Sequence, residues 1–297
     1  MARVAKLIVH DGMTPPPRLY HYTSQRGLLG ILSSKSLWAT RIQYLNDSTE
    51  FAYALGLWKD AVQDRIQRSE TDNVLPGDIK TRLKPLLVGL HKAFDSLSKI
   101  PVYVACFSED GDALSQWRGY CRTGSGFSIG FDSSQLLSAG SEQRCFLAPC
   151  IYDPQRQAEL IDRLFIGIFE DAGLFQHAQK EPQERPDSRK ICFDIALDFI
   201  VLASLLKHPS FRDEREWRIV TQEISDDHPQ IAIREGKLVP IPYFEFELAK
   251  PEVELNVEIV AGPNQEMDLA IGSLATLLKR KKCIASSRAS SVPYREL

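Results

Sequence analysis

The sequence predicts an α+β fold: one domain with a mixed, mostly antiparallel β-sheet and helices inserted between its strands. Short apolar runs of strand length recur between residues 19 and 260. Longer stretches with apolar residues at three- and four-residue steps separate several of these runs, as in amphipathic helices. No internal repeat or long linker divides the chain, so we expect a single domain over residues 19–297, preceded by an N-terminal arm over residues 1–18.

The composition is that of an ordinary globular protein, with 43% hydrophobic and 25% charged residues. A formal net charge of -3 does not favour a general nucleic-acid-binding surface. The chain has no apolar run of about eighteen residues, the length of a membrane span, and its proline-rich start is too polar for a signal peptide. Six cysteines without a C-x-x-C pair are typical of reduced thiols. We therefore expect a cytoplasmic protein without membrane contact.

The first elements follow from local patterns. Residues 4–9 predict a short strand or arm. A strand over residues 19–23 ends at Ser24, a good N-cap for the helix that follows. Residues 36–40 predict the next strand, and an apolar stripe over residues 51–66 predicts an amphipathic helix.

The rest of the chain alternates between the same two periods. Strands are predicted over residues 102–108, 127–132, 145–152, 214–220, 231–234, 238–248 and 257–260, of which 231–234 and 238–248 form a hairpin. Helices are predicted over residues 154–175 and 187–206, with a helical turn at 112–120 and a last helix ending near Lys282. The helix over residues 187–206 is apolar around most of its circumference, so we expect it deep inside the protein.

The strand from Glu214 carries the strongest candidate for chemistry. Its alternation places Glu214 and Glu216 on one face, opposite Trp217. Like charges at such short range raise each other's pKa. One carboxylate could stabilise a developing cation while the other orients or deprotonates an acceptor. Ion pairing across neighbouring strands is the alternative explanation.

Other candidate residues are aromatic or polar and suit a flat ligand that carries a ribose. Tyrosine and tryptophan provide stacking surfaces, histidine binds a ribose hydroxyl, and a carboxylate stabilises positive charge at the anomeric carbon. These residues are His21, Tyr22, Thr23, Trp38, Asn46, Trp117, Arg118, Tyr120 and Lys207. For Asn46, Arg118 and Lys207, a capping or ion-pair role is the alternative. Asp47 and Glu50 have the spacing of a capping box.

No histidine pair has the spacing of a zinc motif, and the sequence contains no Gly-x-Ser-x-Gly elbow. We therefore predict no resident metal and no serine nucleophile.

An ordered set of motifs resembles a known family. The motifs are Leu19–Ser24, Tyr44–Glu50, Cys106–Glu109 with Trp117 and Tyr120, Gly126–Asp132, Lys207 with Glu214–Arg218, Gly262–Pro263 and Pro293–Arg295. Together they resemble the bacterial domain-of-unknown-function family twenty-nine seventy-one over residues 19–295. That family name implies no activity.

A second, more distant resemblance implies chemistry. The strand with His21, the helix with Leu29–Leu32 and the strand at Leu37 look like the start of DNA-modifying ADP-ribosyltransferase toxins. This resemblance implies an ADP-ribosyltransferase-like fold with NAD as the substrate. In it, His21 would contact the NAD ribose, and Glu216 would be the catalytic glutamate of a Glu-x-Glu pair with Glu214. The middle aromatic position of that superfamily is either Tyr120 or Trp38.

The sequence therefore predicts an NAD-dependent ADP-ribosyltransferase or NAD glycohydrolase that acts as a bacterial toxin or antiphage-defence effector. Its acceptor would be nucleic acid, protein or water, and a cognate antitoxin or defence-system partner is expected. Two alternatives stay open. One is a metal-dependent nuclease or phosphodiesterase that uses Asp47, Glu50, Glu109 and the Glu214–Glu216 pair. The other is a non-enzymatic sensor that binds a nucleotide.

Overall fold

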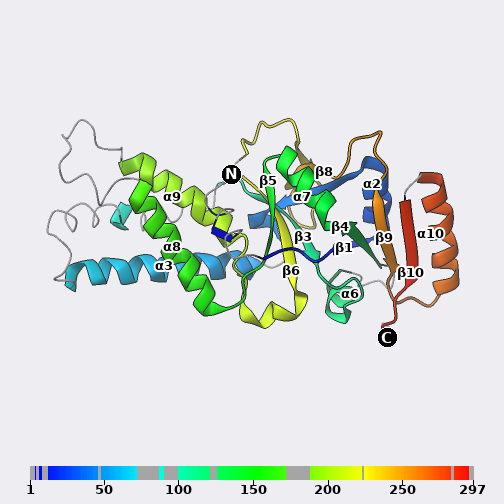
Figure 1. The fold of residues 1–297 in the computed structure, drawn as a ribbon, viewed down its shortest axis with the longest axis horizontal. Coiled ribbons are helices and arrows are strands. Elements are labelled where there is room, and N and C mark those ends of the chain that lie inside the picture. Colours follow the sequence, from blue (N-terminus) through cyan, green and yellow to red (C-terminus); the bar gives the residue numbers. More distant parts are fainter. Residues whose placement is uncertain are drawn as a thin grey trace.

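The computed structural model describes residues 4, 7–8, 13–45, 48–71, 87–89, 100–120, 126–171, 188–222, 224–281 and 284–293. Within these ranges the chain forms one ten-stranded sheet with helices around it (Figure 1). Every strand pair is antiparallel except β9 with β10, which confirms the predicted mixed, mostly antiparallel sheet.

The strands are β1 (Arg18–Ser24), β2 (Ser36–Arg41), β3 (Tyr103–Ser108), β4 (Gly126–Asp132), β5 (Cys145–Pro149), β6 (Glu216–Thr221), β7 (Ile231–Arg234), β8 (Ile241–Glu247), β9 (Asn256–Ala261) and β10 (Ile284–Ala289). The α-helices are α2 (Gln25–Ser34), α3 (Ser48–Thr71), α6 (Leu114–Tyr120), α7 (Ser133–Glu142), α8 (Pro154–Asp171), α9 (Ser188–Ala203) and α10 (Met267–Lys281). Two 3₁₀ helices are η1 (Ile42–Tyr44) and η4 (Pro209–Glu214). No helix in the described ranges is long and apolar enough to cross a membrane.

The sheet forks at β3. Strand β6 pairs with β3 along Val104–Ser108 and occupies one edge of that strand. Strand β1 pairs with β3 only at Ser108, and β2 pairs with it only at Tyr103 and Val104. At both Ser108 and Val104, β6 occupies one edge of β3, so the second strand paired there must lie on the other edge. Strands β1 and β2 therefore pair with the same edge of β3, at its two opposite ends. The β3 edge between them, around Cys106, has no strand partner among the described residues.

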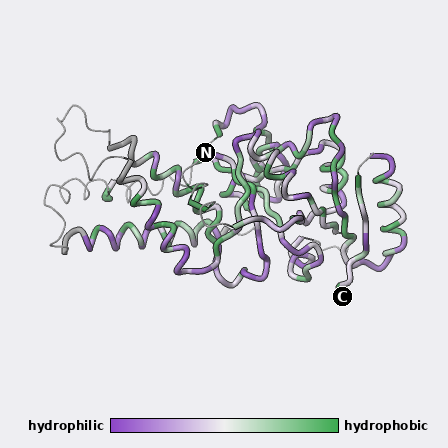
Figure 2. Tube along the Cα trace, viewed as in Figure 1, coloured by the Kyte–Doolittle hydropathy of each residue, from purple (hydrophilic) through white to green (hydrophobic). Residues whose placement is uncertain are grey.

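Helices cover both faces of the sheet. On one face, α3, α8 and α9 enclose a core with apolar residues of β3, β5 and β6. On the other, α2, α7 and α10 pack over a second core built from β1, β2, β3, β4, β6, β8 and β9. Figure 1 shows α3, α8 and α9 together at one end of the molecule, far from α10. Figure 2 shows hydrophobic positions along the central strands and mixed positions along α3 and α8, as expected for amphipathic helices.

Several local predictions are confirmed. The Ser24 side chain caps α2 by accepting a hydrogen bond from the Gly27 amide at 3.2 Å. The predicted hairpin is present as β7 and β8. Helix α9 buries Ile195, Phe199 and Ile200 almost completely, although Phe193 near its start is exposed.

Other predictions are wrong. Val4, Leu7 and Ile8 are helical, not extended, and Val4 and Ile8 are buried in the core beneath α3, α8 and α9. At this spacing the three residues lie on one face of a helix. A short apolar segment also fits a strand, so the pattern alone does not distinguish the two. Helix α7 was not predicted, because its N-cap, Asp132, was read only as the end of a strand.

Strand β6 also starts two residues later than predicted. Glu214 ends η4, and Arg215 adopts a left-handed conformation with φ 41° before β6 begins at Glu216. The tail beyond Lys281 returns to the sheet as β10, parallel to β9.

The loop after β3 is fixed to β1 through the ring of Tyr20. A Cβ atom at Gly111 would lie 2.5 Å from this ring, and one at Gly130 would lie 2.6 Å from it. The ring is thus held between two glycines, while its hydroxyl donates to Glu258 at 2.9 Å. We expect Gly111→Ala to lower the free energy of unfolding by about 1–3 kcal/mol through overpacking.

The same substitution made in a Tyr20→Ala background should change the free energy of unfolding by less than about 0.5 kcal/mol. Urea denaturation of the wild type, both single variants and the double variant measures this coupling. Additive effects would show that the ring is not the obstacle.

Candidate functional site

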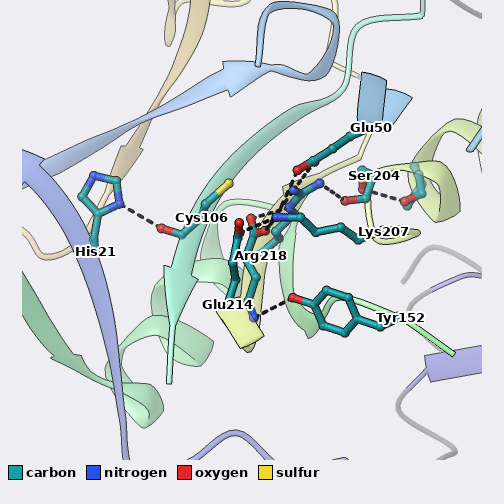
Figure 3. A network of polar contacts seen from close by, with 10 residues as sticks. His21, Glu50, Cys106, Tyr152, Ser204, Lys207, Glu214 and Arg218 are labelled. Atoms are coloured by element: carbon teal, nitrogen blue, oxygen red, sulfur yellow. Dashed lines mark hydrogen bonds and ion pairs between the residues drawn. The ribbon is translucent and has the colours of Figure 1, made fainter. Parts of the chain in front are cut away.

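A buried cluster of charges lies between β6 and the helices α3 and α9, with Lys207 at its centre (Figure 3). The Lys207 Nζ atom lies 2.5 Å from the Glu216 carboxylate, 2.6 Å from Glu214 and 3.0 Å from Glu50. Arg218 is the second cation of the cluster and is also buried. We call Glu50, Lys207, Glu214, Glu216 and Arg218 the carboxylate network.

Main-chain contacts hold Lys207 and Glu216 in place. The Lys207 amide donates to the Ile151 carbonyl at 3.1 Å, and its own carbonyl accepts from the Gln157 side chain at 2.8 Å. The Glu216 amide donates to the hydroxyl of Tyr152 at 3.0 Å. Both side chains are therefore presented by backbone that is fixed independently of their charges.

Arg218 joins the network to the helices. Its Nε donates to Glu216 at 2.7 Å, and one Nη donates to Glu50 in the first turn of α3 at 2.6 Å. The other Nη donates to the Ser204 carbonyl at 2.7 Å, just after α9 ends. Unpaired carbonyls and the helix dipole favour a cation at that position.

A backbone reversal brings Glu214 next to Glu216. Arg215, between them, has φ 41°, a left-handed conformation that is unfavourable for a residue with a side chain. Its side chain pairs with Asp110 at 3.1 Å, and its carbonyl accepts from the Glu109 amide at 3.1 Å. Such backbone conformations persist where surrounding contacts enforce them, often at functional sites.

The network contains three carboxylates and two cations, so one negative charge is in excess. Burial by itself raises the pKa of Glu216, but Arg218 and Lys207 outweigh it and lower that pKa to about 2. Burial alone lowers the pKa of Lys207, while Glu216 and Glu50 raise it above its usual value. Glu216 is therefore an ionised carboxylate at neutral pH.

Two further side chains, those of Cys106 and Tyr120, lie near Glu216. The Cys106 thiol shares a hydrogen bond with it, and burial followed by the Glu216 charge raises the pKa of this thiol. Burial and the charges of Cys106, Glu216 and Glu214 raise the pKa of Tyr120. Tyr120 as a whole residue is nevertheless 45% exposed, and the Glu214 side chain is 27% exposed. The network thus reaches solvent at Glu214, beside Tyr120.

His21 lies in the fork of the sheet. Its Nδ1 atom is 2.9 Å from the Cys106 carbonyl, which has no strand partner on that edge of β3 among the described residues. Figure 3 shows the His21 ring on one side of β3 and the carboxylate network on the other. Burial lowers the pKa of His21, with the Cys106 hydrogen bond acting in the opposite direction. The neutral ring therefore replaces a missing strand contact.

Tyr22 and Trp117, two of the predicted ligand contacts, pack against each other instead. Their ring centroids lie 4.7 Å apart, and Trp117 is completely buried. The Tyr22 hydroxyl donates to the Asp110 carbonyl at 2.8 Å, and the Trp117 indole donates to Asp112 at 2.8 Å. In this arrangement Trp117 has no free ring face for stacking on a ligand.

The other predicted site residues lie in different places. Thr23 is half-buried near the end of β1, and Arg118 is exposed on α6. Trp38 is exposed on β2 and stacks on Tyr243. Asn46 and Asp47 lie outside the described residues. Of the predicted set, the structure brings together Lys207, Glu214, Glu216 and Tyr120.

Sequence reasoning did not place Glu50 or Arg218 in the predicted NAD site, although it grouped Glu50 with Glu214 and Glu216 in the metal-dependent alternative. Glu50 was assigned to a capping box with Asp47, but its carboxylate pairs with Lys207 and Arg218. The sequence did contain a signal for Arg218, because strand alternation places this arginine on the same face as Glu216. Glu109, assigned to the alternative metal site, accepts a hydrogen bond from the Trp217 indole at 2.8 Å instead.

The position where Glu50, Glu214 and Glu216 converge is occupied by the Lys207 ammonium group. Among the described residues, no group of three or more histidine, cysteine, aspartate or glutamate side chains has the geometry to hold a metal ion. The carboxylates are thus arranged around a cation that the chain itself provides.

Comparison with known proteins identifies one family. Residues 116–219 match a family model described as "Protein of unknown function (DUF2971)". This segment is similar to that family. It runs from α6 to β6 and so contains Tyr120, Lys207, Glu214, Glu216 and Arg218, whereas Glu50 and His21 precede it. No curated protein and no solved structure matches the chain. The resemblance to ADP-ribosyltransferase toxins stays a prediction.

The depressed pKa of Glu216 predicts acid sensitivity. Because the folded state keeps Glu216 ionised, its contribution to stability is complete above the unfolded-state pKa near 4.5 and is lost as the pH falls toward 2. A shift of this size corresponds to a contribution on the order of 3 kcal/mol. We expect the free energy of unfolding of the wild type to fall between pH 5 and pH 2 more steeply than that of Glu216→Gln. Equal slopes in urea denaturation would contradict this account.

The lowered pKa of His21 predicts a second, separate pH effect. Below an unfolded-state pKa of about 6.5, the unfolded chain binds a proton that the folded state excludes. Stability should therefore fall from pH 7.5 to pH 5.5 in the wild type. His21→Asn keeps a donor for the Cys106 carbonyl but does not titrate, so it should flatten this slope. A thermal-denaturation series over that range tests the prediction, which an unchanged slope would overturn.

Proposed function

We propose that this protein cleaves the bond between nicotinamide and ribose in NAD, as an ADP-ribosyltransferase or NAD glycohydrolase, with Glu216 as the catalytic carboxylate. One observation carries the proposal: a fixed, ionised glutamate belongs to a network with one excess negative charge that reaches solvent beside an exposed tyrosine.

The charge of the network suits this bond. Nicotinamide carries a positive charge in NAD, and departure of the ring leaves positive charge on the ribose carbon. An ionised carboxylate that is already oriented stabilises such a centre without reorganising during the reaction. Arg218 and Lys207 orient Glu216, and Glu50 with Glu214 leaves the surroundings net negative.

Glu214 and Tyr120 support the same assignment from the solvent side. Glu214 is more exposed than Glu216 and shares the Lys207 ammonium group with it. This position fits a group that orients or deprotonates an acceptor. The exposed Tyr120 ring offers a face on which nicotinamide would stack.

In this proposal His21 contacts the NAD ribose, as the toxin resemblance implies, but only one of its two ring nitrogens is free to do so. Its Nδ1 is engaged by the Cys106 carbonyl, so in the neutral ring only Nε2 is available to accept from a ribose hydroxyl. The strand register places His21 and Glu216 on opposite faces of the sheet, so a substrate that contacts both would have to pass through the fork between β1 and β2. An ADP-ribosyltransferase-like fold and a role as a bacterial toxin or defence effector are parts of the proposal that rest on the resemblance alone.

Nicotinamide release from NAD by the purified protein tests the proposal. Glu216→Gln should lower kcat by about 100-fold or more, since it removes a charge that acts in the transition state. The KM for NAD should change much less, because the amide side chain of this variant keeps the shape of the site. Glu142→Gln, on the exposed side of α7, is the matched control and should leave the rate unchanged.

Circular dichroism establishes that Glu216→Gln is folded before the rates are compared. Added DNA, RNA or cell extract distinguishes transfer to an acceptor from hydrolysis. Undiminished release by a folded Glu216→Gln protein would remove Glu216 from the mechanism. No release by the wild type, with or without extract, would overturn the proposed activity.

A further inference from the structure

A second polar and aromatic surface lies on β2, β7 and β8, outside the carboxylate network. Trp38 stacks on Tyr243 with ring centroids 4.5 Å apart and an interplanar angle of 28°. Trp38 is 53% exposed, so the ring face turned away from Tyr243 is accessible. A single exposed aromatic residue is ordinary on a protein surface, but here charged groups flank the pair.

A carboxylate lies directly beside the exposed tryptophan. Glu245 is opposite Trp38 in the β2–β8 ladder, and alternation places Glu245, Tyr243 and Trp38 on the same face. The buried Ser36 hydroxyl donates to one oxygen of Glu245 at 2.8 Å and fixes the orientation of the carboxylate. The second oxygen of Glu245 has no hydrogen bond to the described residues.

A guanidinium group completes the surface. The Arg234 side chain reaches the Thr40 hydroxyl at 3.4 Å, and its buried Nε has no hydrogen-bond partner among the described residues. No carboxylate within the described part of the chain forms an ion pair with Arg234. Burial and then Glu245 raise the pKa of Tyr243, while Arg234 acts in the opposite direction, so both charges lie near this ring.

We propose that Trp38, Tyr243, Glu245 and Arg234 form a binding shelf for a purine nucleotide. The base stacks on the free face of Trp38, an interaction that any nucleobase can make and that a two-ring purine makes over the larger area. The free oxygen of Glu245 accepts a hydrogen bond from a ribose hydroxyl. Arg234, which lacks an ionic partner in the described chain, binds the phosphate.

The shelf lies on the same sheet face as Glu216. Thr40 pairs with Val104 in β3, and Val104 pairs with Val220 in β6, so these three side chains share one face of the sheet. Alternation along β2 and β6 places Trp38 and Glu216 on that same face. The nucleotide is thus either the adenylate half of NAD, a reading that rests on the proposed function, or a free mononucleotide.

Calorimetric titration of the full chain with AMP, adenosine, CMP and inorganic phosphate tests the shelf. The wild type should bind AMP more tightly than adenosine or CMP. Trp38→Ala should weaken AMP binding about tenfold or more, whereas Trp38→Phe, which keeps a ring, should stay within about threefold of the wild type. Arg234→Gln should reduce AMP binding to the level of adenosine and leave adenosine binding unchanged.

Arg26→Gln, an exposed arginine on α2, controls for the change in net charge and should bind AMP as the wild type does. Undetectable AMP binding, or equal AMP binding by the wild type and a folded Trp38→Ala protein, would overturn the shelf. So would loss of adenosine binding in Arg234→Gln, since that substitution leaves the stacking ring in place.

Competition separates the two sources of nucleotide. If NAD displaces AMP and Trp38→Ala raises the KM for NAD in the nicotinamide assay, the shelf holds the adenylate half of NAD. If NAD does not displace AMP, the ligand is a free mononucleotide. AMP binding without any nicotinamide release would remove the proposed activity and leave the shelf intact.

Discussion

The buried pairing of Lys207 and Arg218 with three carboxylates is the constraint on which the rest of the structure depends. Taking charges out of water is expensive unless opposite charges and hydrogen bonds satisfy them. Every member of the network is therefore fixed by its partners: Glu50 from α3, Lys207 after α9, and Glu214 with Glu216 around the turn at Arg215. The helical end of the molecule and the sheet meet at these charges, so their relative position is set by ion pairs as well as by the apolar core.

The fork at β3 is the second organising feature. A sheet that continued without interruption would satisfy the Cys106 carbonyl with a neighbouring strand, but β1 and β2 leave the same edge at opposite ends. His21 satisfies that carbonyl instead. The fork thus brings a histidine, a thiol hydrogen-bonded to Glu216, and the network itself onto three neighbouring strands.

The segment that matches the family model contains most of the carboxylate network. The matched segment contains four of the five network residues and Tyr120, and it ends within β6, one residue after Arg218. Glu50 enters from outside that segment and pairs with both cations. The proposed cleavage of NAD rests on the charge pattern of the network, and the proposed nucleotide shelf rests on the exposed Trp38 surface.

Local patterns determined most of the elements. Short strand-length runs identified β1, β2, β3 and β4, alternation identified β6, helical periodicity identified α3, the apolar circumference identified α9, and a serine N-cap marked the start of α2. One error arose because Val4, Leu7 and Ile8 fit either a strand or a helix. A second arose at Arg215, whose left-handed conformation has no sequence signature because glycine is the usual residue in that conformation.

The sequence alone determined that Arg218 stands on the same strand face as Glu216, whereas Glu214 joins them through the left-handed turn at Arg215. Only the tertiary structure decided which charges meet them. Glu50 lies 166 positions before Glu216 in the chain, and no local pattern relates an α3 residue to a β6 residue. It was likewise the fold that buried Trp117 and left Trp38 exposed, because exposure depends on which elements pack over a ring and not on the residue itself.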